Sequence, residues 1–412
     1  MLVEIHMLQN HAPSNLNRDD TGSPKDCLFG DVRRARISSQ CLKRSIRKSQ
    51  VLADEMKDIT MGWRTRKLPE LVRKKLIEKK VSPDLAMASA LKVAQFGKKK
   101  VKKANKAAGK KATEDVEEPE EAGEAEEEVD SVPSESKDIQ TAQIMFLTPS
   151  EVDAVVETMY SAIQGKTASE IGDLSQDDLQ REINKKKKAS ITPDIALFGR
   201  MITSDAFVNV QASIQVAHAI STNKIEHDFD YFTAVDDLKK LSGSSDDLGA
   251  GMLGDVEFNS ACYYKYFSLD TDNFISNIVG DKKSKEQAEQ AMQLLKQTIR
   301  AFLMAAIHTT PTGKQNTFAA HQLPDAILVE VRARKTPVSY ANAFIDPARL
   351  QAGKDLVTVS VEKLLEHAEL LRKKFGLEAK SRLWFTTRNI KLPNSDYCET
   401  TKDLFTKLEA AL

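Results

Sequence analysis

The residues with the clearest chemical potential lie between Asp31 and Asp54, a stretch with seven basic side chains and no acidic one. The seven are Arg33, Arg34, Arg36, Lys43, Arg44, Arg47 and Lys48. The last four follow a predicted helix start, where Ser38, Ser39 and Gln40 stand. Spacings of three and four place basic groups on one helix face, and free N–H groups at a helix start favour anions. The pattern predicts phosphate binding; the alternative is a solvated basic helix face.

A second candidate site is the long connection at residues 223–255, which joins two predicted strands. Loops of this length between strands are uncommon and are often functional. The connection combines glycines that allow hinge motion with apolar groups that could wedge against bases or a neighbouring molecule. These groups are Gly243, Gly249, Gly251, Gly254, Phe229, Tyr231, Phe232, Met252 and Leu253. The alternative is that the aromatic side chains pack on their own domain.

Sequence motifs for enzyme chemistry are absent. The sequence contains no Walker loop, no G-x-G-x-x-G, no G-x-S-x-G and no H-E-x-x-H. The seven histidines do not fall at metal-ligand spacings, and His218 is interpreted as a core histidine on an apolar strand face. The four cysteines form no C-x-x-C pair, and we expect them to be reduced. We therefore expect a protein that is not an enzyme and that needs no cofactor and no metal.

Composition places the chain among globular proteins, with 412 residues, 41% hydrophobic and 29% charged residues and a mean hydropathy of -0.41. No window approaches 18 consecutive apolar residues, so we expect a cytoplasmic protein without a membrane partner. The net charge is zero, but the charges are segregated: residues 1–111 carry 27 basic and 11 acidic side chains. Such asymmetry is a hint of a polyanionic partner.

Residues 98–138 form the clearest compositional boundary. Eight lysines between Lys98 and Lys111 are followed by eleven acidic residues between Glu114 and Asp130, and no aromatic residue occurs. Such a segment cannot bury enough apolar surface to offset its ordering entropy. We interpret it as a charged, low-complexity insert, either a solvated loop or a segment whose lysines touch nucleic acid.

The elements that must position these groups follow from hydrophobic periodicity. Alternating residues predict strands, and capping signals at Thr148 and Ser284 start two of the helices. The predicted strands cover residues 2–8, 208–220, 256–267 and 326–331. One predicted helix starts near residue 38 and another covers 68–95. Two more start at 149 and 285, and the last of these ends before Pro311. Strands interleaved with helices fit an α+β fold with one antiparallel sheet.

Several of these segments resemble a known family. They are SNLNRDDTGSPKDCLFGDVRRARISSQCLKRSIRKS at residues 14–49, DIALFGRM at 194–201, VAHAIST at 216–222, DYFTAVDDL at 230–238, KQNTFAAH at 314–321 and SYANAF at 339–344. In this order they are similar to the CasC-type backbone subunit of the type I-E CRISPR Cascade complex. The resemblance is weaker over residues 351–412, and the insert at 98–138 departs from compact members.

The resemblance implies a hand-shaped architecture. A palm with an RRM-like (ferredoxin-like) antiparallel sheet would comprise residues 1–37 and 189–345, and helical fingers would comprise 38–188. A thumb would occupy 223–255, and a C-terminal helical segment at 346–412 would pack on the palm. Copies would stack head to tail along a crRNA, which pairs with target DNA, alongside other Cascade subunits and a recruited helicase-nuclease.

The resemblance also implies particular RNA-binding residues. In the palm these are Arg18, Lys25, Ser38, Gln40, Lys43 and Arg47, with Arg200, Met201, Lys314 and Gln315 on or near the same track. The thumb, including Tyr231 and Phe232, would displace a base at regular intervals. Such a scaffold must hold the RNA backbone and leave base edges free for pairing.

Two other functions stay open at this point. In related backbone subunits a loop aspartate supports metal-dependent RNA cleavage, so Asp19, Asp20 or Asp26 could serve as an endonuclease centre. A monomeric chaperone for single-stranded RNA is the other alternative, and it predicts binding without regular multiplicity. Sizing the protein on RNAs of increasing length separates the chaperone from a stacking subunit.

Overall fold

The computed structural model describes residues 1–97, 139–186, 191–234, 252–280 and 284–412. These residues divide into two compact units. The first, called the sheet unit here, comprises Met1–Met61, Ile191–Arg200 and Val210–Leu412; the second, the helical unit, comprises Gly62–Ser190 and Met201–Asn209. The charged insert at residues 98–138 lies outside the described residues. Within these ranges, no helix has both the length and the apolar character needed to cross a membrane.

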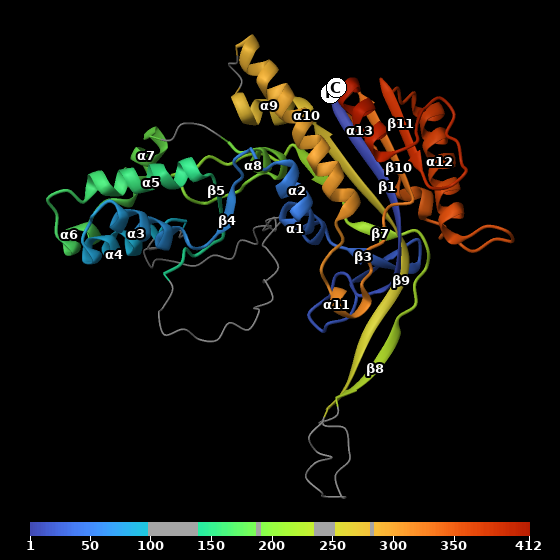
Figure 1. Ribbon diagram of the computed structural model, residues 1–412, viewed down its shortest axis with the longest axis horizontal. Helices are drawn as coiled ribbons and strands as arrows, with labels where there is room; N and C mark the ends of the chain where they lie inside the picture. The colour runs from blue at the N-terminus through green and yellow to red at the C-terminus, as the bar shows by residue number, and fades with distance from the viewer. Residues whose placement is uncertain (98–138, 187–190, 235–251, 281–283) are drawn as a thin grey trace, which may run out of the picture. The chain divides into compact units, whose positions relative to one another are not determined.

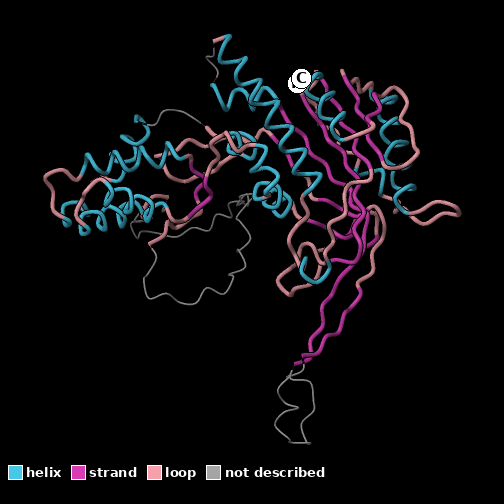
Figure 2. Tube along the Cα trace, viewed as in Figure 1, coloured by secondary structure: helices cyan, strands magenta, loops and turns pink. Residues whose placement is uncertain are grey.

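The sheet unit is organised around one large sheet (Figures 1 and 2). Its strand order is β12-β11-β10-β1-β9-β7-β3-β2, and β6 and β8 also pair with β9. The strands are β1 (Leu2–Ser14), β2 (Asp26–Phe29), β3 (Val32–Ile37), β6 (Ile214–Val216), β7 (Ala219–Ser221), β8 (Asp228–Ala234), β9 (Met252–Asp270), β10 (Ala326–Arg332), β11 (Ser381–Thr386) and β12 (Asp396–Cys398). All pairings are antiparallel except that of β11 with β12. The predicted α+β class is confirmed.

Helices of the sheet unit lie on both faces of this sheet (Figure 1). They are α1 (Ser39–Lys48), α2 (Gln50–Glu55), α8 (Pro193–Phe198), α9 (Thr271–Val279), α10 (Lys285–His308), α11 (Gln315–Phe318), η2 (Ala341–Phe344), α12 (Leu356–Phe375) and α13 (Thr401–Ala411). Because side chains alternate along a strand, Ile5 of β1 joins the core that contains α10, whereas Leu8 joins the core that contains α12. Strand β1 is therefore buried on both faces.

The helix starts agree with the sequence prediction. Ser284 and Gln287 form a reciprocal capping box at the start of α10, and that helix ends at His308, before Pro311. The helical unit has the same device at Thr148 and Glu151, which begin α5 (Pro149–Ala162). Each box satisfies backbone N–H groups that a helix start leaves unpaired. Local chemistry alone therefore sets these boundaries.

The predicted long strand at residues 208–220 was wrong. Only β6 and β7 form there, because the carbonyls of Gln211 and Ala212 accept hydrogen bonds from the side chains of Asn277 and Asn273 on α9, at 2.9 and 3.1 Å. His218 consequently lies between strands and is exposed, 3.2 Å from Arg36, so the interpretation as a core histidine was also wrong.

The C-terminal region is only partly helical. Residues 346–412, predicted as a helical segment, contain the helices α12 and α13, but β11 and β12 also form there and extend the sheet beyond β10. Leu383 and Trp384 of β11 are buried, and β11 pairs with β10 along its whole length. By pairing with β10, the strand satisfies backbone N–H and C=O groups that β10 would otherwise leave unpaired at the edge of the sheet. The sequence analysis missed this pairing.

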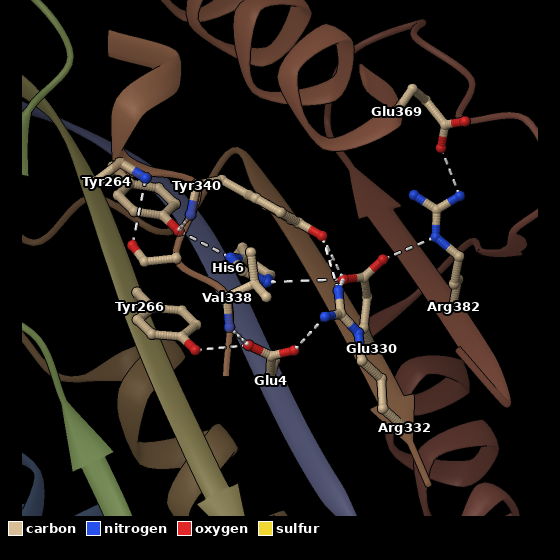
Figure 3. Close-up of polar contacts among 12 residues, drawn as sticks. Glu4, His6, Tyr264, Tyr266, Glu330, Arg332, Val338, Tyr340, Glu369 and Arg382 are labelled. Carbon is tan, nitrogen blue, oxygen red and sulfur yellow. Dashed lines mark hydrogen bonds and ion pairs between the residues drawn. The ribbon is translucent and has the colours of Figure 1, made fainter. Parts of the chain in front are cut away.

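A buried network of charged groups lies between the sheet and α12 (Figure 3). Glu330 accepts hydrogen bonds from Arg382 at 2.9 Å and from the hydroxyl of Tyr340 at 2.7 Å, and it pairs with Arg332. Arg332 also lies 3.0 Å from Glu4. Since these side chains are almost fully buried, the network tolerates no unpaired charge without a large cost.

The same network pins the segment that follows β10. Glu4 accepts a hydrogen bond from the backbone N–H of Val338 at 2.7 Å, and the hydroxyl of Tyr264 accepts one from the N–H of Tyr340 at 2.9 Å. His6 stacks on Tyr340 with ring centroids 4.2 Å apart. Burial lowers the pKa of His6 to about 3, so the ring is neutral at physiological pH. The path of the chain into η2 is thereby fixed.

The helical unit packs around its own apolar core, to which Leu76, Phe96 and Val155 contribute. Its elements are β4 (Trp63–Thr65), α3 (Leu68–Glu78), α4 (Pro83–Val93), β5 (Met145–Leu147), α5, α6 (Ala168–Gly172) and α7 (Gln176–Lys186). Strands β4 and β5 form a two-stranded antiparallel ribbon. The single helix predicted for residues 68–95 is broken at 79–82, where Lys80 has a positive φ and Pro83 begins α4.

Candidate nucleic-acid interface

Arg33 and Arg34 are neighbours on β3 but point to opposite faces, as alternation along a strand requires. Arg33 is exposed and forms an ion pair with Asp26 of β2. Arg34 is fully buried, and burial lowers the pKa of its guanidinium. The prediction that Arg34 contacts RNA therefore needs correction, because its side chain is not accessible to a ligand in the structure.

Arg34 instead ties together three distant parts of the sheet unit. Its guanidinium donates to the carbonyls of Thr222 at 2.8 Å and Phe344 at 2.6 Å. It also donates to Phe29, Ser221 and Ile345, each at 3.2 Å. Hydrogen bonds from a charged group are the stronger kind. Arg34 therefore holds the β2–β3 hairpin in place. The position of the hairpin in turn sets the orientation of the exposed residues next to Arg34.

The long connection between the predicted strands is a ribbon rather than a loop. Strand β8 pairs with the outer half of β9, and the two project from the sheet (Figure 1). Phe229, Tyr231 and Phe232 on β8 are 55%, 80% and 42% exposed. Because of strand alternation, Tyr231 and Phe232 face opposite sides of the ribbon. Tyr231 therefore makes little contact with its own domain, whereas Phe229 and Phe232 are partly covered.

Phe232 owes its position to a glycine on the opposite strand. Phe232 and Gly254 are register partners, and a Cβ atom at Gly254 would lie only 2.5 Å from the ring. An aromatic ring over a cross-strand glycine stabilises a ribbon that otherwise has few contacts. Residues 235–251 lie outside the described residues, as do the side chains of Met252 and Leu253, although both residues belong to β9.

A groove of about 730 Å³ lies at the base of this ribbon. Its cationic lining comes from Lys25, Arg33 and Arg36, which were predicted, and from Lys224, which was not. Lys224 stands alone in the sequence, so no pattern marked it. Asp19, Asp26, Glu226, His227 and Glu257 add polar and acidic groups to the lining. The groove thus brings together side chains from the β2–β3 hairpin and from the foot of the ribbon.

His227 connects the ribbon to the β2–β3 hairpin. Its Nδ1 atom is paired with Glu257 of β9, and its Nε2 atom lies 3.4 Å from Asp26 of β2. All three side chains are less than one quarter exposed. The sequence analysis missed His227, because a single histidine at no recognised spacing carries no signal. This contact fixes the foot of the ribbon against the wall of the groove.

The start of α1 uses its capping groups internally. The hydroxyl of Ser38 accepts a hydrogen bond from the N–H of Cys41 at 3.2 Å, and Ser38 and Ser39 are buried. Gln40 and Arg44 are exposed, whereas Lys43 and Arg47 are half-buried on the flanks of the helix. The predicted helix start is confirmed, and the Ser38 hydroxyl serves it as a cap.

The remaining predicted residues are spread over the chain. Arg18 is half-buried. Arg200, in the sheet unit, is only 6% exposed, so its predicted contact with RNA needs the same correction as that of Arg34. Met201, in the helical unit, is 77% exposed. Lys314 adopts a left-handed backbone conformation before α11, and the amide of Gln315 braces that turn through Pro311 and Ala320, at 2.9 and 2.8 Å.

The acidic residues of the first loop have structural partners. Asp19 accepts hydrogen bonds from Thr21 and Ser23, and its pKa is lowered chiefly by the Thr21 hydroxyl. Asp26 is paired with Arg33, and Asp20 is exposed. The described part of the chain contains no group of three or more histidine, cysteine or carboxylate side chains placed to hold a metal ion.

Comparison with known proteins places this geometry in a family. A family model for CT1975-like protein matches residues 3–410, so the chain belongs to this family of Cas proteins. No curated protein matches it. Among solved structures it is similar to a chain of "CRISPR RNA-guided surveillance complex, pre-nicking", with 26% identity, full coverage of both chains and a TM-score of 0.75. A chain of "CRISPR RNA-guided surveillance complex", 23% identical over both full lengths with a TM-score of 0.67, has the same fold.

Proposed function

We propose that this chain is a non-catalytic, crRNA-binding subunit of a CRISPR surveillance complex. Family membership and the likeness to a chain of such a complex support this proposal. The observation that carries it is the ribbon: three exposed aromatic side chains project beside a groove that contains Lys25, Arg33 and Arg36. Stacking surfaces next to cations are the usual means of binding a single strand without reading its sequence.

In this proposal the sheet unit is the palm, with an RRM-like character, the helical unit forms the fingers, and the β8–β9 ribbon is the thumb. Cations of the groove and of α1 hold phosphates, and Tyr231 or Phe232 separates neighbouring bases. The base edges stay free, so the guide pairs with target DNA and sequence specificity resides in the RNA. The closest functional description is the CasC-type backbone subunit of a type I-E Cascade.

The partners follow from that role. Several copies stack head to tail along the crRNA, a heterologous contact whose length the RNA and the end subunits limit. Other Cascade subunits complete the complex, and a separate helicase-nuclease cuts the target. We place the protein in the cytoplasm, without a membrane partner.

Purification from cells that carry the CRISPR array and partner genes tests this proposal. We expect repeat-spacer RNA of one length with several protein copies on each RNA. Heterogeneous cellular RNA at one copy each would favour the chaperone function instead. The variant R33A/R36A should lower RNA occupancy, whereas K354A, which removes an exposed lysine paired with Glu362, serves as a charge control and should not.

The non-catalytic part has its own test. Alanine at Asp19, Asp20 and Asp26 should leave the co-purified RNA at the same length, because Asp19 and Asp26 already hold a turn and an arginine. Loss of metal-dependent cuts in target RNA, with guide binding intact, would make the endonuclease alternative correct.

A further inference from the structure

A second group of basic and aromatic side chains lies in the helical unit and contains none of the residues predicted above to bind RNA. Trp63 and Arg64 lie on β4, and Arg66 and Lys67 follow it directly. All four are exposed, and the indole of Trp63 is 42% accessible. An aromatic ring beside basic groups is the combination that proteins use to bind single-stranded nucleic acid.

The arginines of this group differ from two lysines of α3, which are paired with carboxylates. On α3, Lys74 pairs with Glu70 at 3.0 Å, and Lys75 pairs with Asp153. Lys67 lies near Glu70, whose pKa is lowered first by the hydrogen bond from Lys74 and then by nearby charges that include Lys67. Among the described residues, no carboxylate forms an ion pair with Arg64 or Arg66.

The backbone presents these side chains along one strand of a two-stranded sheet. Within the described residues, strand β4 pairs with β5 on one side only. Thr141 fixes the end of the strand, since its N–H donates to the carbonyl of Arg66 at 3.0 Å. Alternation sends Trp63 to one face of this edge and Arg64 to the other, and Arg66 follows directly after the strand. A chain molecule lying along the edge therefore meets a ring on one side and guanidinium groups on the other.

We infer that the β4 edge, with Trp63, Arg64 and Arg66, is a second binding surface for single-stranded nucleic acid. Trp63 stacks on an unpaired base, and the two arginines hold the flanking phosphates. A single strand fits better than a duplex, because the ring needs a base whose face is open. The surface adds to the proposed function a contact that belongs to the helical unit alone.

The chain provides its own optical probe for this stacking. It has two tryptophans, Trp63 and Trp384, and Trp384 is fully buried. Titration of the full chain with a uridine homopolymer should therefore quench the fluorescence of Trp63 and leave that of Trp384 unchanged. In the variant W63F the quenching should disappear while most of the affinity remains, because a phenyl ring also stacks. W63A should lose affinity by about tenfold.

The arginines are tested against a matched charge control. R64A/R66A should weaken binding and reduce the slope of log affinity against log salt by about 1.4, or about 0.7 per lost phosphate contact. K74A/K185A removes two charges from the same unit, both from lysines paired with glutamates, and should change the slope far less. W63F keeps an aromatic ring at this exposed position, so it separates the loss of the optical probe from the loss of stacking.

The outcomes distinguish this surface from the candidate interface. Binding that leaves Trp63 fluorescence unchanged, with R64A/R66A equal to its control, would overturn the inference and leave the proposed function standing. The same would follow if R64A/R66A bound nucleic acid normally but lost a partner subunit from the purified complex, since the patch would then bind protein. Quenching that persists when R33A/R36A weakens overall binding supports two separate surfaces.

Discussion

The two halves of β9 lie in different environments: one half is buried in the large sheet, and the other belongs to the exposed ribbon. From Tyr263 to Asp270 the strand is almost wholly buried in the large sheet, and Tyr264 and Tyr266 each bond a partner side chain, His6 and Glu4. The outer half pairs with β8 only, and Tyr231 on β8 is 80% exposed. Tyrosine in the sheet completes a polar network, whereas tyrosine on the ribbon offers a face for contact. Environment, rather than residue type, separates the two roles.

The difference teaches where stability and binding should fail. A buried network must be complete, because a low dielectric strengthens satisfied pairs and penalises unpaired groups. An exposed ribbon loses little when a side chain is removed, since water replaces the lost contact. Mutations in the sheet should therefore affect unfolding first, and mutations on the ribbon should affect RNA binding first.

Acidic pH should destabilise the buried part of the sheet, and this is the largest effect that we expect. Burial lowers the pKa of His6 and of His11 from 6.5 to about 3. Below pH 6.5 these histidines bind protons in the unfolded chain but not in the folded chain. Their contribution to the free energy of unfolding is therefore complete above pH 6.5 and falls as the pH drops towards 3. Each histidine should lower the free energy of unfolding by on the order of 3 kcal/mol between pH 6.5 and pH 4.

Urea unfolding across this pH range measures the loss. The variant H6F should have a shallower pH dependence than the wild type, whereas H308A, which removes an exposed histidine, should keep it. Equal slopes for wild type and H6F would show that protonation of His6 is not coupled to unfolding.

Removal of Glu330 is the next largest change. E330A leaves Arg382 and Arg332 short of their shared carboxylate in the interior, which typically costs about 3–5 kcal/mol. The matched control E362A breaks the exposed pair with Lys354 and should cost at most about 1 kcal/mol. Denaturant midpoints of the two variants give the comparison directly. A loss for E330A no larger than that for E362A would contradict the importance of the network.

On the ribbon, Y231A should affect binding rather than folding. We expect a loss of about 1–3 kcal/mol in affinity for single-stranded RNA, with a change in the free energy of unfolding within about 0.5 kcal/mol. The variant T233A, two residues along the same strand, is the control. Anisotropy titration and thermal unfolding of the same preparations separate the two effects. Unchanged affinity would remove Tyr231 from the proposed thumb.

Arg33 and Arg34 extend the comparison between exposed and buried positions to two adjacent residues. R33A should reduce the salt slope of RNA binding by about 0.7 and change stability little, because the Arg33 side chain itself is exposed to solvent. R34A should instead lower the unfolding midpoint, because five carbonyls lose their donor. The prediction fails if the two variants have the same stability.

Sequence reasoning succeeded where the determining contacts are local. The capping boxes of α5 and α10 and the strand that begins at Leu2 are each specified within a few residues. It failed where the deciding partner is distant. Arg34 and Arg33 look the same in sequence, and only the carbonyls near Thr222 and Phe344 make one of them structural. The strand β11 likewise needs β10 beside it to form.

The reach of Arg34 has a consequence for the order in which the protein is made. Its guanidinium donates a hydrogen bond to the carbonyl of Phe344, which follows it by 310 residues in the chain. At a synthesis rate of about 5–20 residues per second, the carbonyl partner leaves the ribosome about 15–60 s after the arginine. Until then the β2–β3 hairpin lacks the hydrogen bond from Arg34 to Phe344. The groove is therefore completed late in translation, so a nascent chain does not present a finished groove to RNA before most of the polypeptide exists.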